Sequence, residues 1–159
     1  MNSTTTIIIK APYERIFLLA SRVEDWGDIL PHYRYVRVLK RAENRKLLKM
    51  SAWRDFIPVT WTAVQTVIEG KEGIPGTVIF HHTRGLVRGM DVAWTFEPAH
   101  DGDEVVVRIT HHLHKPSFPV RLLGKKGIDL IVGKLFIGYI AGKTLKRIKL
   151  LAERRVVSR

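Results

Sequence analysis

Residues Ser117–Arg159 read SFPVRLLGKKGIDLIVGKLFIGYIAGKTLKRIKLLAERRVVSR, and this stretch decides the fold. Its apolar residues recur at steps of three, four and seven, which is the spacing of one face of an α-helix. We therefore predict one long C-terminal helix over 117–159 that carries an apolar stripe along its length. The stripe consists of Leu130, Ile137, Ala141, Leu145, Ile148 and Leu151.

The first half of this predicted helix is apolar on a second side, whereas the corresponding side of the second half is cationic. Apolar surface on two sides must be covered on both, so we expect the core on one side and a ligand, a membrane or a partner chain on the other. A helix buried in an ordinary core remains the alternative. The second apolar set is Ile128, Ile131, Val132, Leu135, Phe136 and Tyr139, and the cations are Lys143, Lys146, Arg147 and Lys149.

The residues before this helix have the pattern of a β-meander. A β-branched stretch at 4–10 predicts a first strand, and Pro12 is expected to begin a helix at 13–21, followed by a second short helix at 24–30. Short turns join the strands that follow, which indicates antiparallel pairing. These strands are predicted at 34–41, 46–54, 59–69, 76–83, 90–98 and 104–114.

Period-two alternation places apolar side chains of these strands on one face, which must be covered. The C-terminal helix is the only predicted element long enough to cover it. The sequence therefore predicts an α+β fold in which an antiparallel curved sheet of about seven strands wraps around the C-terminal helix. A chain of 159 residues is also the size of one domain, so we expect a single domain over residues 1–159.

Composition narrows the class of function. The net charge of +12 favours an anionic partner, such as nucleic acid, an acidic lipid surface or an acidic small molecule. The alternative is a generally basic surface that keeps the protein soluble. No compact nucleic-acid-binding motif is present, which disfavours nucleic acid. Because the chain has no cysteine, disulfides, a thiolate nucleophile and cysteine-bound metals are excluded. Neither a signal peptide nor a membrane-spanning stretch is recognised, so we expect a cytoplasmic protein that can contact anionic membrane peripherally.

Four groups of residues give the chain a family resemblance. They are VEDW at 23–26 with ILPHY at 29–33, RGMDVAW at 88–94 with FEP at 96–98, VVVRITH at 105–111, and IAGKTL at 140–145. On these residues the chain resembles the START-like helix-grip (SRPBCC) superfamily, and within it the polyketide cyclase/dehydrase and coenzyme Q-binding group. The likeness covers nearly the whole chain.

The resemblance implies a hydrophobic cavity between the sheet and the C-terminal helix. It also implies one of two functions. The first is binding or transport of an apolar small molecule, such as a lipid, a quinone or a polyketide-like compound. The second is polyketide cyclase, aromatase or dehydratase activity. No cofactor is expected in either case. A homodimer through the second apolar side of the C-terminal helix is a further hypothesis.

Aromatic side chains on the predicted strands suit a pocket for a flat apolar ligand, although core packing also accounts for some of them. Trp26 and Tyr33 stand at the turn from helix to sheet, where they either form the cavity mouth or anchor the short helices. The predicted ligand-binding residues are Trp26, Tyr33, Trp53, Trp61, Phe80, His82, Trp94, Phe96, His111, Leu135, Phe136 and Tyr139.

His82 and His111 interrupt apolar rows of the predicted strands. A polar group there should be paired or should face a cavity. In a cyclase, Arg54 or Arg88 would stabilise an enolate and one of the two histidines would transfer a proton, since the ordinary histidine pKa is about 6.5. No nucleophile with a base and an orienting group is recognised. No metal site is predicted either, because no carboxylate completes the set of outward-facing histidines, His81, His112 and His114.

Overall fold

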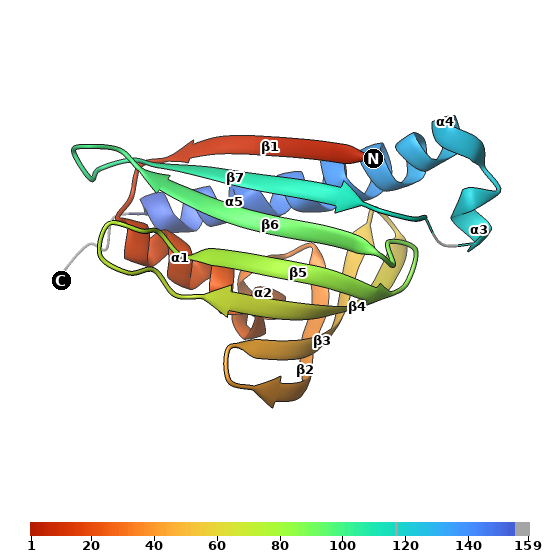
Figure 1. Ribbon diagram of the computed structural model, residues 1–159, viewed down its shortest axis with the longest axis horizontal. Helices are drawn as coiled ribbons and strands as arrows, with labels where there is room; N and C mark the ends of the chain where they lie inside the picture. The colour runs from red at the N-terminus through yellow and green to blue at the C-terminus, as the bar shows by residue number, and fades with distance from the viewer. Residues whose placement is uncertain (117, 155–159) are drawn as a thin grey trace.

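The computed structural model describes residues 1–116 and 118–154, without the side chains of Pro119, Leu135 and Phe136. A long helix lies behind a broad antiparallel sheet, the short helices near the N-terminus lie behind the sheet as well, and the start of the C-terminal helical segment projects beyond it (Figure 1). The strands are β1 (Asn2–Ile9), β2 (Tyr33–Ala42), β3 (Arg45–Arg54), β4 (Ile57–Ile68), β5 (Thr77–Arg84), β6 (Met90–Pro98) and β7 (Val105–Leu113). The helices are α1 (Tyr13–Ser21), η1 (Val23–Asp25), α2 (Trp26–Ile29), α3 (Phe118–Arg121), α4 (Gly124–Ile128), η2 (Asp129–Ala141) and α5 (Gly142–Glu153).

The strands form one sheet in the order β1-β7-β6-β5-β4-β3-β2, and every neighbouring pair is antiparallel. β1 therefore joins the meander at its far edge, where Ile7 pairs with Val107. Register shifts in β2–β3 and at Thr62 and Ala63 of β4 mark irregularities of the kind that bend a sheet. The predicted α+β fold with a curved sheet is confirmed.

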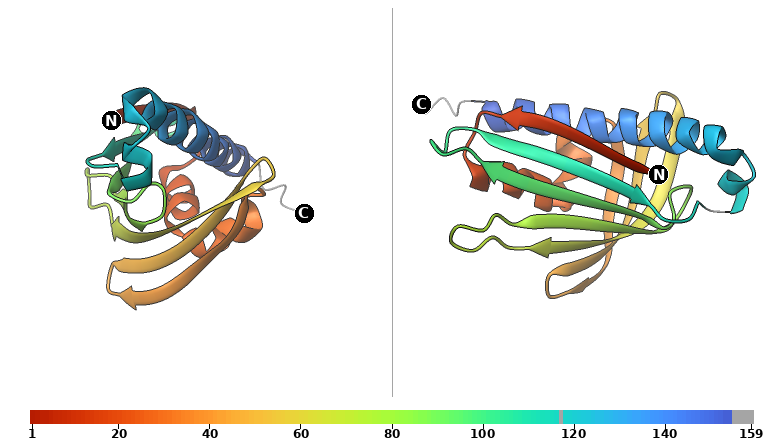
Figure 2. Two further views of the ribbon diagram at one scale, coloured as in Figure 1. Left: turned by 90° about the vertical axis from the view of Figure 1, so that its right-hand side faces the viewer. Right: turned by 45° about the horizontal axis from the view of Figure 1, so that its top comes forward.

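The curved sheet surrounds its covering helices (Figure 2). Side chains on its inner face alternate regularly with outer ones; in β7 every second residue from Val105 to Leu113 is buried. They meet the buried stripe of the C-terminal helix, which includes Ile137, Leu145 and Ile148. Leu130, predicted to begin this stripe, is instead 52% exposed. The core therefore lies between one face of the sheet and one face of the helix, as the periodicities predict. No helix among the described residues is both long and apolar enough to cross a membrane.

The C-terminal helix differs from the prediction at its beginning. We predicted one helix over 117–159, but α3 is a separate turn and the long helix begins at Gly124, whose φ of 65° is in the left-handed region. From there α4, η2 and α5 follow one another without interruption to Glu153. The middle segment, η2, is a π-helix, a wider form with i→i+5 hydrogen bonds that is rare at this length. Residues 117 and 155–159 of the prediction lie outside the described residues.

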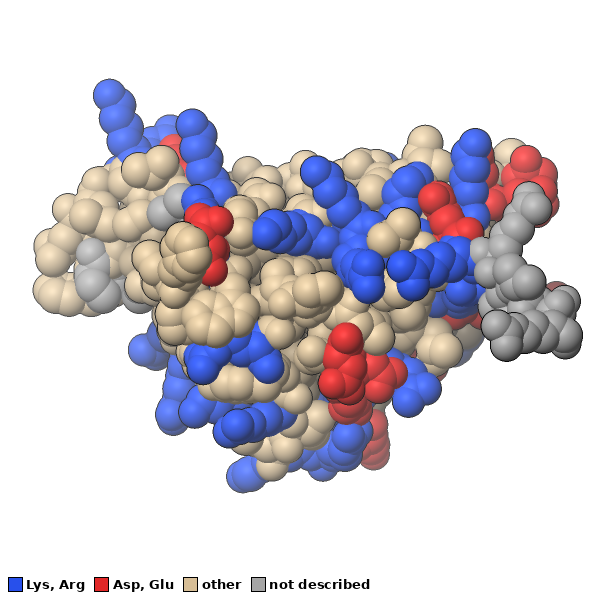
Figure 3. All heavy atoms as spheres, turned by 180° about the vertical axis from the view of Figure 1, so that it is seen from behind, with Lys and Arg blue, Asp and Glu red and all other residues tan. Residues whose placement is uncertain are grey.

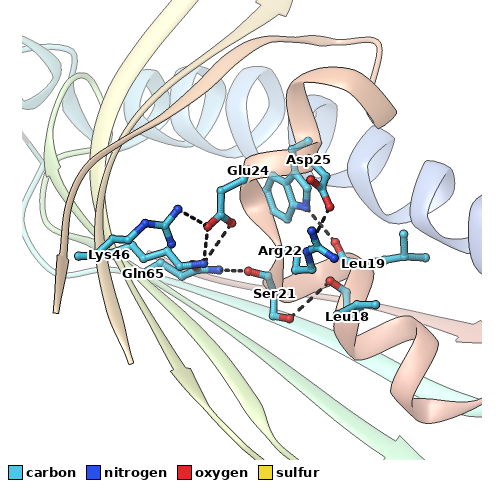
Figure 4. A network of polar contacts seen from close by, with 10 residues as sticks. Leu18, Leu19, Ser21, Arg22, Glu24, Asp25, Lys46 and Gln65 are labelled. Atoms are coloured by element: carbon cyan, nitrogen blue, oxygen red, sulfur yellow. Dashed lines mark hydrogen bonds and ion pairs between the residues drawn. The ribbon is translucent and has the colours of Figure 1, made fainter. Parts of the chain in front are cut away.

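Polar contacts hold the short helices against the sheet (Figure 4). The Gln65 side chain in β4 is fully buried and its Nε2 donates to the Ser21 carbonyl at the end of α1, over 2.9 Å. Glu24 in η1 forms ion pairs with Arg41 and Lys46, in which its Oε1 lies 2.8 Å from Arg41 Nη2 and 2.8 Å from Lys46 Nζ. These contacts fix the segment that leads into α2, and so they position the first residue of α2, Trp26.

Candidate functional site

An inner cavity of about 50 Å³ lies between the sheet and the C-terminal helix. All its lining residues come from β2 to β7, α2 and the helix segment around Ile140. A volume of this size holds a few water molecules, since one water needs about 10–15 Å³ measured in this way. The cavity is lined by Trp26, Tyr33, Met50, Trp61, Phe80, His82, Met90, Val92, Trp94, Ile109, His111, Ile140, Ala141 and Thr144.

Aromatic rings form a connected wall of this cavity. The Trp26 ring centroid lies 5.3 Å from that of Tyr33, 5.9 Å from that of Phe80 and 6.0 Å from that of Trp94. Tyr33 in turn lies 6.1 Å from Trp61. The indole Nε1 of Trp26 donates to the Leu19 carbonyl of α1 over 2.9 Å, which fixes the plane of its ring. The wall therefore presents flat apolar surfaces at defined angles, as a pocket for a ring compound requires.

Two histidines, His82 and His111, line the cavity. Burial lowers the pKa of His111 to about 4. Burial, together with the charge that His111 would carry, lowers the pKa of His82 to about 3. Both rings are therefore neutral at pH 7. The Nδ1 atom of His111 is buried and has no hydrogen-bond partner among the described residues, so it is available to a polar group that enters the cavity.

A second hollow, which we call the outer groove, lies on the other side of the same helix and has a volume of about 780 Å³. It runs between the C-terminal helix, the α2–β2 turn and the β3–β4 turn. The side of the molecule that carries this helix shows lysine and arginine side chains gathered beside residues without charge (Figure 3). The outer groove is lined by Pro31, His32, Trp53, Asp55, Phe56, Tyr139, Lys143, Lys146, Arg147 and Leu150.

One side-chain contact joins a residue of the outer groove to a residue of the inner cavity. His32 lines the groove, Thr144 lines the cavity, and His32 Nε2 lies 2.9 Å from Thr144 Oγ1. The threonine hydroxyl donates to the Ile140 carbonyl over 2.9 Å, which leaves its oxygen to accept from His32. Burial and the charge of Lys143 lower the pKa of His32 to about 4, so this contact joins two neutral groups at pH 7.

The structure brings seven of the predicted ligand-binding residues to the inner cavity and places two others, Trp53 and Tyr139, in the outer groove. Phe96 lines neither, because it packs against Tyr13 and Phe17 in the core. The side chains of Leu135 and Phe136 lie outside the described residues. The seven at the cavity are Trp26, Tyr33, Trp61, Phe80, His82, Trp94 and His111.

Neither arginine of the predicted cyclase site lines the inner cavity. Arg88 is exposed in the β5–β6 turn. Arg54 lies at the end of β3 beside the outer groove, with its guanidinium 4.4 Å from the Tyr139 ring centroid and paired with Asp55. The prediction relied on their closeness in sequence to apolar rows. The direction of a side chain at a strand end or in a turn is set by tertiary packing instead.

Sequence reasoning did not select His32 and Thr144. Each carries a signal in retrospect, since His32 belongs to the ILPHY motif and Thr144 is a polar residue beside the apolar stripe at Leu145. Only the fold shows that the two side chains, 112 residues apart, touch. The methionines Met50 and Met90, also at the cavity, have no feature in the sequence that separates them from ordinary core residues.

Two outward-facing histidines, His81 and His114, bind one carboxylate, whereas His112 contacts the side chain of Asn2. Asp91 accepts from His81 over 2.5 Å and from His114 over 2.8 Å across the outer face of the sheet. Although partial burial opposes it, these contacts lower the pKa of Asp91. In the part of the chain that the structure describes, no group of three or more histidine or carboxylate side chains is placed to hold a metal ion.

Comparisons with known proteins agree with this geometry. A family model described as polyketide cyclase/dehydrase and lipid transport matches residues 9–135. The bifunctional cyclase/dehydratase of the actinorhodin polyketide synthase from Streptomyces coelicolor is 29% identical over 106 residues. This alignment covers 67% of the chain but only 32% of that relative, so the chain spans about a third of its length.

Solved structures show the same fold. The Zhui aromatase/cyclase from a Streptomyces species superposes with a TM-score of 0.77 at 16% identity, covering 99% of this chain and 96% of the other. A START superfamily protein from Mycobacterium smegmatis superposes with a TM-score of 0.72 at 15% identity, covering 96% and 97%. These likenesses confirm the predicted helix-grip fold.

Proposed function

The chain belongs to the polyketide cyclase/dehydrase and lipid transport family, and from this premise we propose that residues 1–159 form one domain that binds an apolar, ring-bearing small molecule in the inner cavity. The observation that carries the proposal is the cavity wall. Five aromatic side chains and two buried, neutral histidines face one space under the C-terminal helix. Such a wall favours flat apolar ligands with few polar atoms.

The cavity must enlarge to take such a ligand. Pockets for small molecules have volumes of about 300–1,000 Å³, whereas the inner cavity has about 50 Å³. Ile140 and Ala141, which line it, lie at the end of the π-helical segment η2. π-helical segments occur frequently at functional sites. We therefore expect the ligand to enter by displacing this part of the helix from the sheet.

A matched pair of variants tests the location of the site. Val92 lines the inner cavity, whereas Val106 is on the outer face of the neighbouring strand. Val92→Phe should weaken binding of a neutral aromatic probe, naphthamide, at least about tenfold, or 1.4 kcal/mol, and Val106→Phe should leave it unchanged. Tryptophan fluorescence reports binding because Trp26, Trp61 and Trp94 line the cavity. Equal affinity in all three proteins would contradict the proposal, as would purified protein that neither carries nor binds any apolar molecule.

Catalysis as a cyclase or dehydratase is the second function that a specific observation favours. Neutral His82 and His111, which line the same apolar cavity, can accept a proton from a carbon acid. We rank catalysis below binding because neither Arg54 nor Arg88 reaches this cavity to stabilise an enolate. If the protein is an enzyme, His82→Ala and His111→Ala abolish turnover of a polyketide substrate and leave the fold intact. Full activity in both variants would remove these roles.

We also propose a peripheral contact with anionic membrane at the α3 end of the chain. Phe118 and Leu122 are 77% and 74% exposed at the projecting α3 end, beside the exposed cations Arg121, Lys125 and Lys126. Exposed apolar groups flanked by cations suit the surface of an anionic membrane. We expect the wild-type protein to sediment with anionic vesicles and not with neutral ones. The variant Leu122→Glu should not sediment with anionic vesicles. Equal sedimentation of the wild-type protein and the variant would contradict this role.

We also propose a homodimer through the second apolar side of the C-terminal helix, although Val132 of that side is fully buried within the protein. Sizing by light scattering tests it, and a monomer at high concentration would exclude it. Nucleic acid gains no support from the family or from the relatives named above.

A further inference from the structure

The outer groove combines cations with apolar surface. Lys143, Lys146 and Arg147 line it, and none of them forms an ion pair among the described residues. The ammonium of Lys143 donates to the Tyr139 hydroxyl over 2.6 Å, and Arg147 Nε donates to the Ile29 carbonyl over 3.1 Å. These contacts hold two of the three cations in place without neutralising them.

The one carboxylate in the groove does not balance this charge, because Asp55 pairs with the neighbouring Arg54. The groove is therefore cationic as a whole and complementary to an anion. Its apolar part is open as well, since Trp53, Phe56 and Leu150 are 39%, 94% and 49% exposed. A site with both characters matches a molecule that has an anionic end and an apolar body.

The groove also adjoins the inner cavity. The His32–Thr144 contact joins their linings, and the His32 ring lies against the cavity residue Tyr33, with centroids 4.9 Å apart. A molecule that lay in the groove and advanced past this contact would meet the aromatic wall of the cavity. The two hollows are therefore arranged as the two ends of one path.

We propose that the outer groove holds the carboxylate or phosphate end of the same small molecule whose apolar rings occupy the inner cavity, and that the ligand passes between them at the His32–Thr144 contact. This inference rests on the proposed function and adds the class of ligand, an anionic amphiphile. The contact of the groove with the aromatic inner cavity favours one small molecule over a lipid surface as the occupant.

Two probes of the same shape test the charge. Naphthoate carries a carboxylate, and naphthamide is its neutral counterpart. The wild-type protein should bind naphthoate about tenfold more tightly, which corresponds to 1.4 kcal/mol, and this preference should shrink at high salt. The double variant Lys143→Gln/Lys146→Gln should lose the preference and keep its affinity for naphthamide. The control Lys125→Gln/Lys126→Gln makes the same change of charge on the same helix outside the groove, and should behave as wild type.

The outcomes separate this inference from the proposed function. Equal affinity of the wild-type protein for the two probes overturns the anionic subsite and leaves the cavity as the binding site. A preference that survives in Lys143→Gln/Lys146→Gln also overturns it. If these lysines are instead needed for sedimentation with anionic vesicles and not for naphthoate, the groove is a lipid contact and the inference fails. Binding of neither probe overturns the proposed function, and this inference with it.

The passage has its own test. Thr144→Val keeps the shape of the side chain but removes the oxygen that contacts His32. We expect naphthamide to associate severalfold faster with this variant in stopped-flow fluorescence, with a smaller change in its Kd. Leu145→Val, next to it on the helix but absent from both linings, is the control. An association rate equal to that of wild type, in a variant whose thermal unfolding shows a native fold, overturns the assignment of the passage.

Discussion

Replacing His111 by glutamine should make the protein more resistant to mild acid. His111 is 4% exposed, and burial lowers its pKa to about 4, whereas in the unfolded chain the pKa is near the ordinary value of 6.5. Above pH 6.5 the imidazole is neutral in both states, so it adds no pH dependence. As the pH falls below 6.5 the unfolded chain binds a proton that the folded protein does not, and stability is lost until the pH reaches about 4.

The size of this effect follows from the two pKa values. At pH 5 the unfolded His111 is almost fully protonated and the folded one is largely neutral, which costs about 2 kcal/mol of unfolding free energy relative to pH 7. His82 and His32 have pKa values lowered to about 3 and about 4, so they add losses of the same sign. His111→Gln removes only the part of this loss of unfolding free energy that comes from His111.

Urea unfolding at pH 7 and pH 5 measures the difference. The drop in unfolding free energy between the two pH values should be smaller by about 2 kcal/mol in His111→Gln than in the wild-type protein. Only the drop between the two pH values is compared between the proteins. A change in stability at pH 7 that the substitution itself causes therefore does not affect the comparison. His100→Gln, which removes an imidazole from an exposed turn, is the control. An identical drop in His111→Gln and wild type would refute the claim that His111 is held neutral by burial.

Three further substitutions test the packing and charge around the site. Gly76→Ala should destabilise the fold by about 1–3 kcal/mol in urea unfolding, because the added Cβ would lie 2.7 Å from the Phe17 ring. Trp26→Phe should lower the unfolding free energy by about 1–3 kcal/mol, since it removes the hydrogen bond to Leu19 and part of the ring, and an unchanged value would show that the bond is not formed. Glu24→Gln should cost less than about 1 kcal/mol because its ion pairs are partly exposed. Although partial burial opposes it, hydrogen bonds from Lys46 and Arg41 lower the pKa of Glu24. The loss of unfolding free energy in Glu24→Gln should therefore be present above pH 4.5 and vanish as the pH falls below the pKa of Glu24 in the folded protein. Unfolding free energies measured across an acid titration test this.

The periodicity of the chain is a local property, and it was sufficient for the parts of the fold that depend on one element at a time. Alternation in β6 and β7 correctly sent Trp94 and His111 inward, and the order of elements indicated which helix covers the sheet. The break before Gly124 was missed because the apolar spacing continues across it, and a left-handed φ leaves no mark in that spacing.

Distances between elements were beyond the reach of the same reasoning. Alternation assigns Phe96 and Trp94 to one face, but packing against α1 buries Phe96 in the core and leaves Trp94 at the cavity. Arg88 stands near an apolar row in sequence and points to solvent in space.

What the sequence by itself determined is the sheet, its covering helix, the family and the presence of His82 and His111 on the inner face, because each of these follows from residue spacing or a short motif. Only the tertiary structure decided the size of the cavity, the position of the cationic groove and the His32–Thr144 contact between them. These features depend on how closely segments far apart in the chain approach one another, and that approach is set by the packing of the whole core.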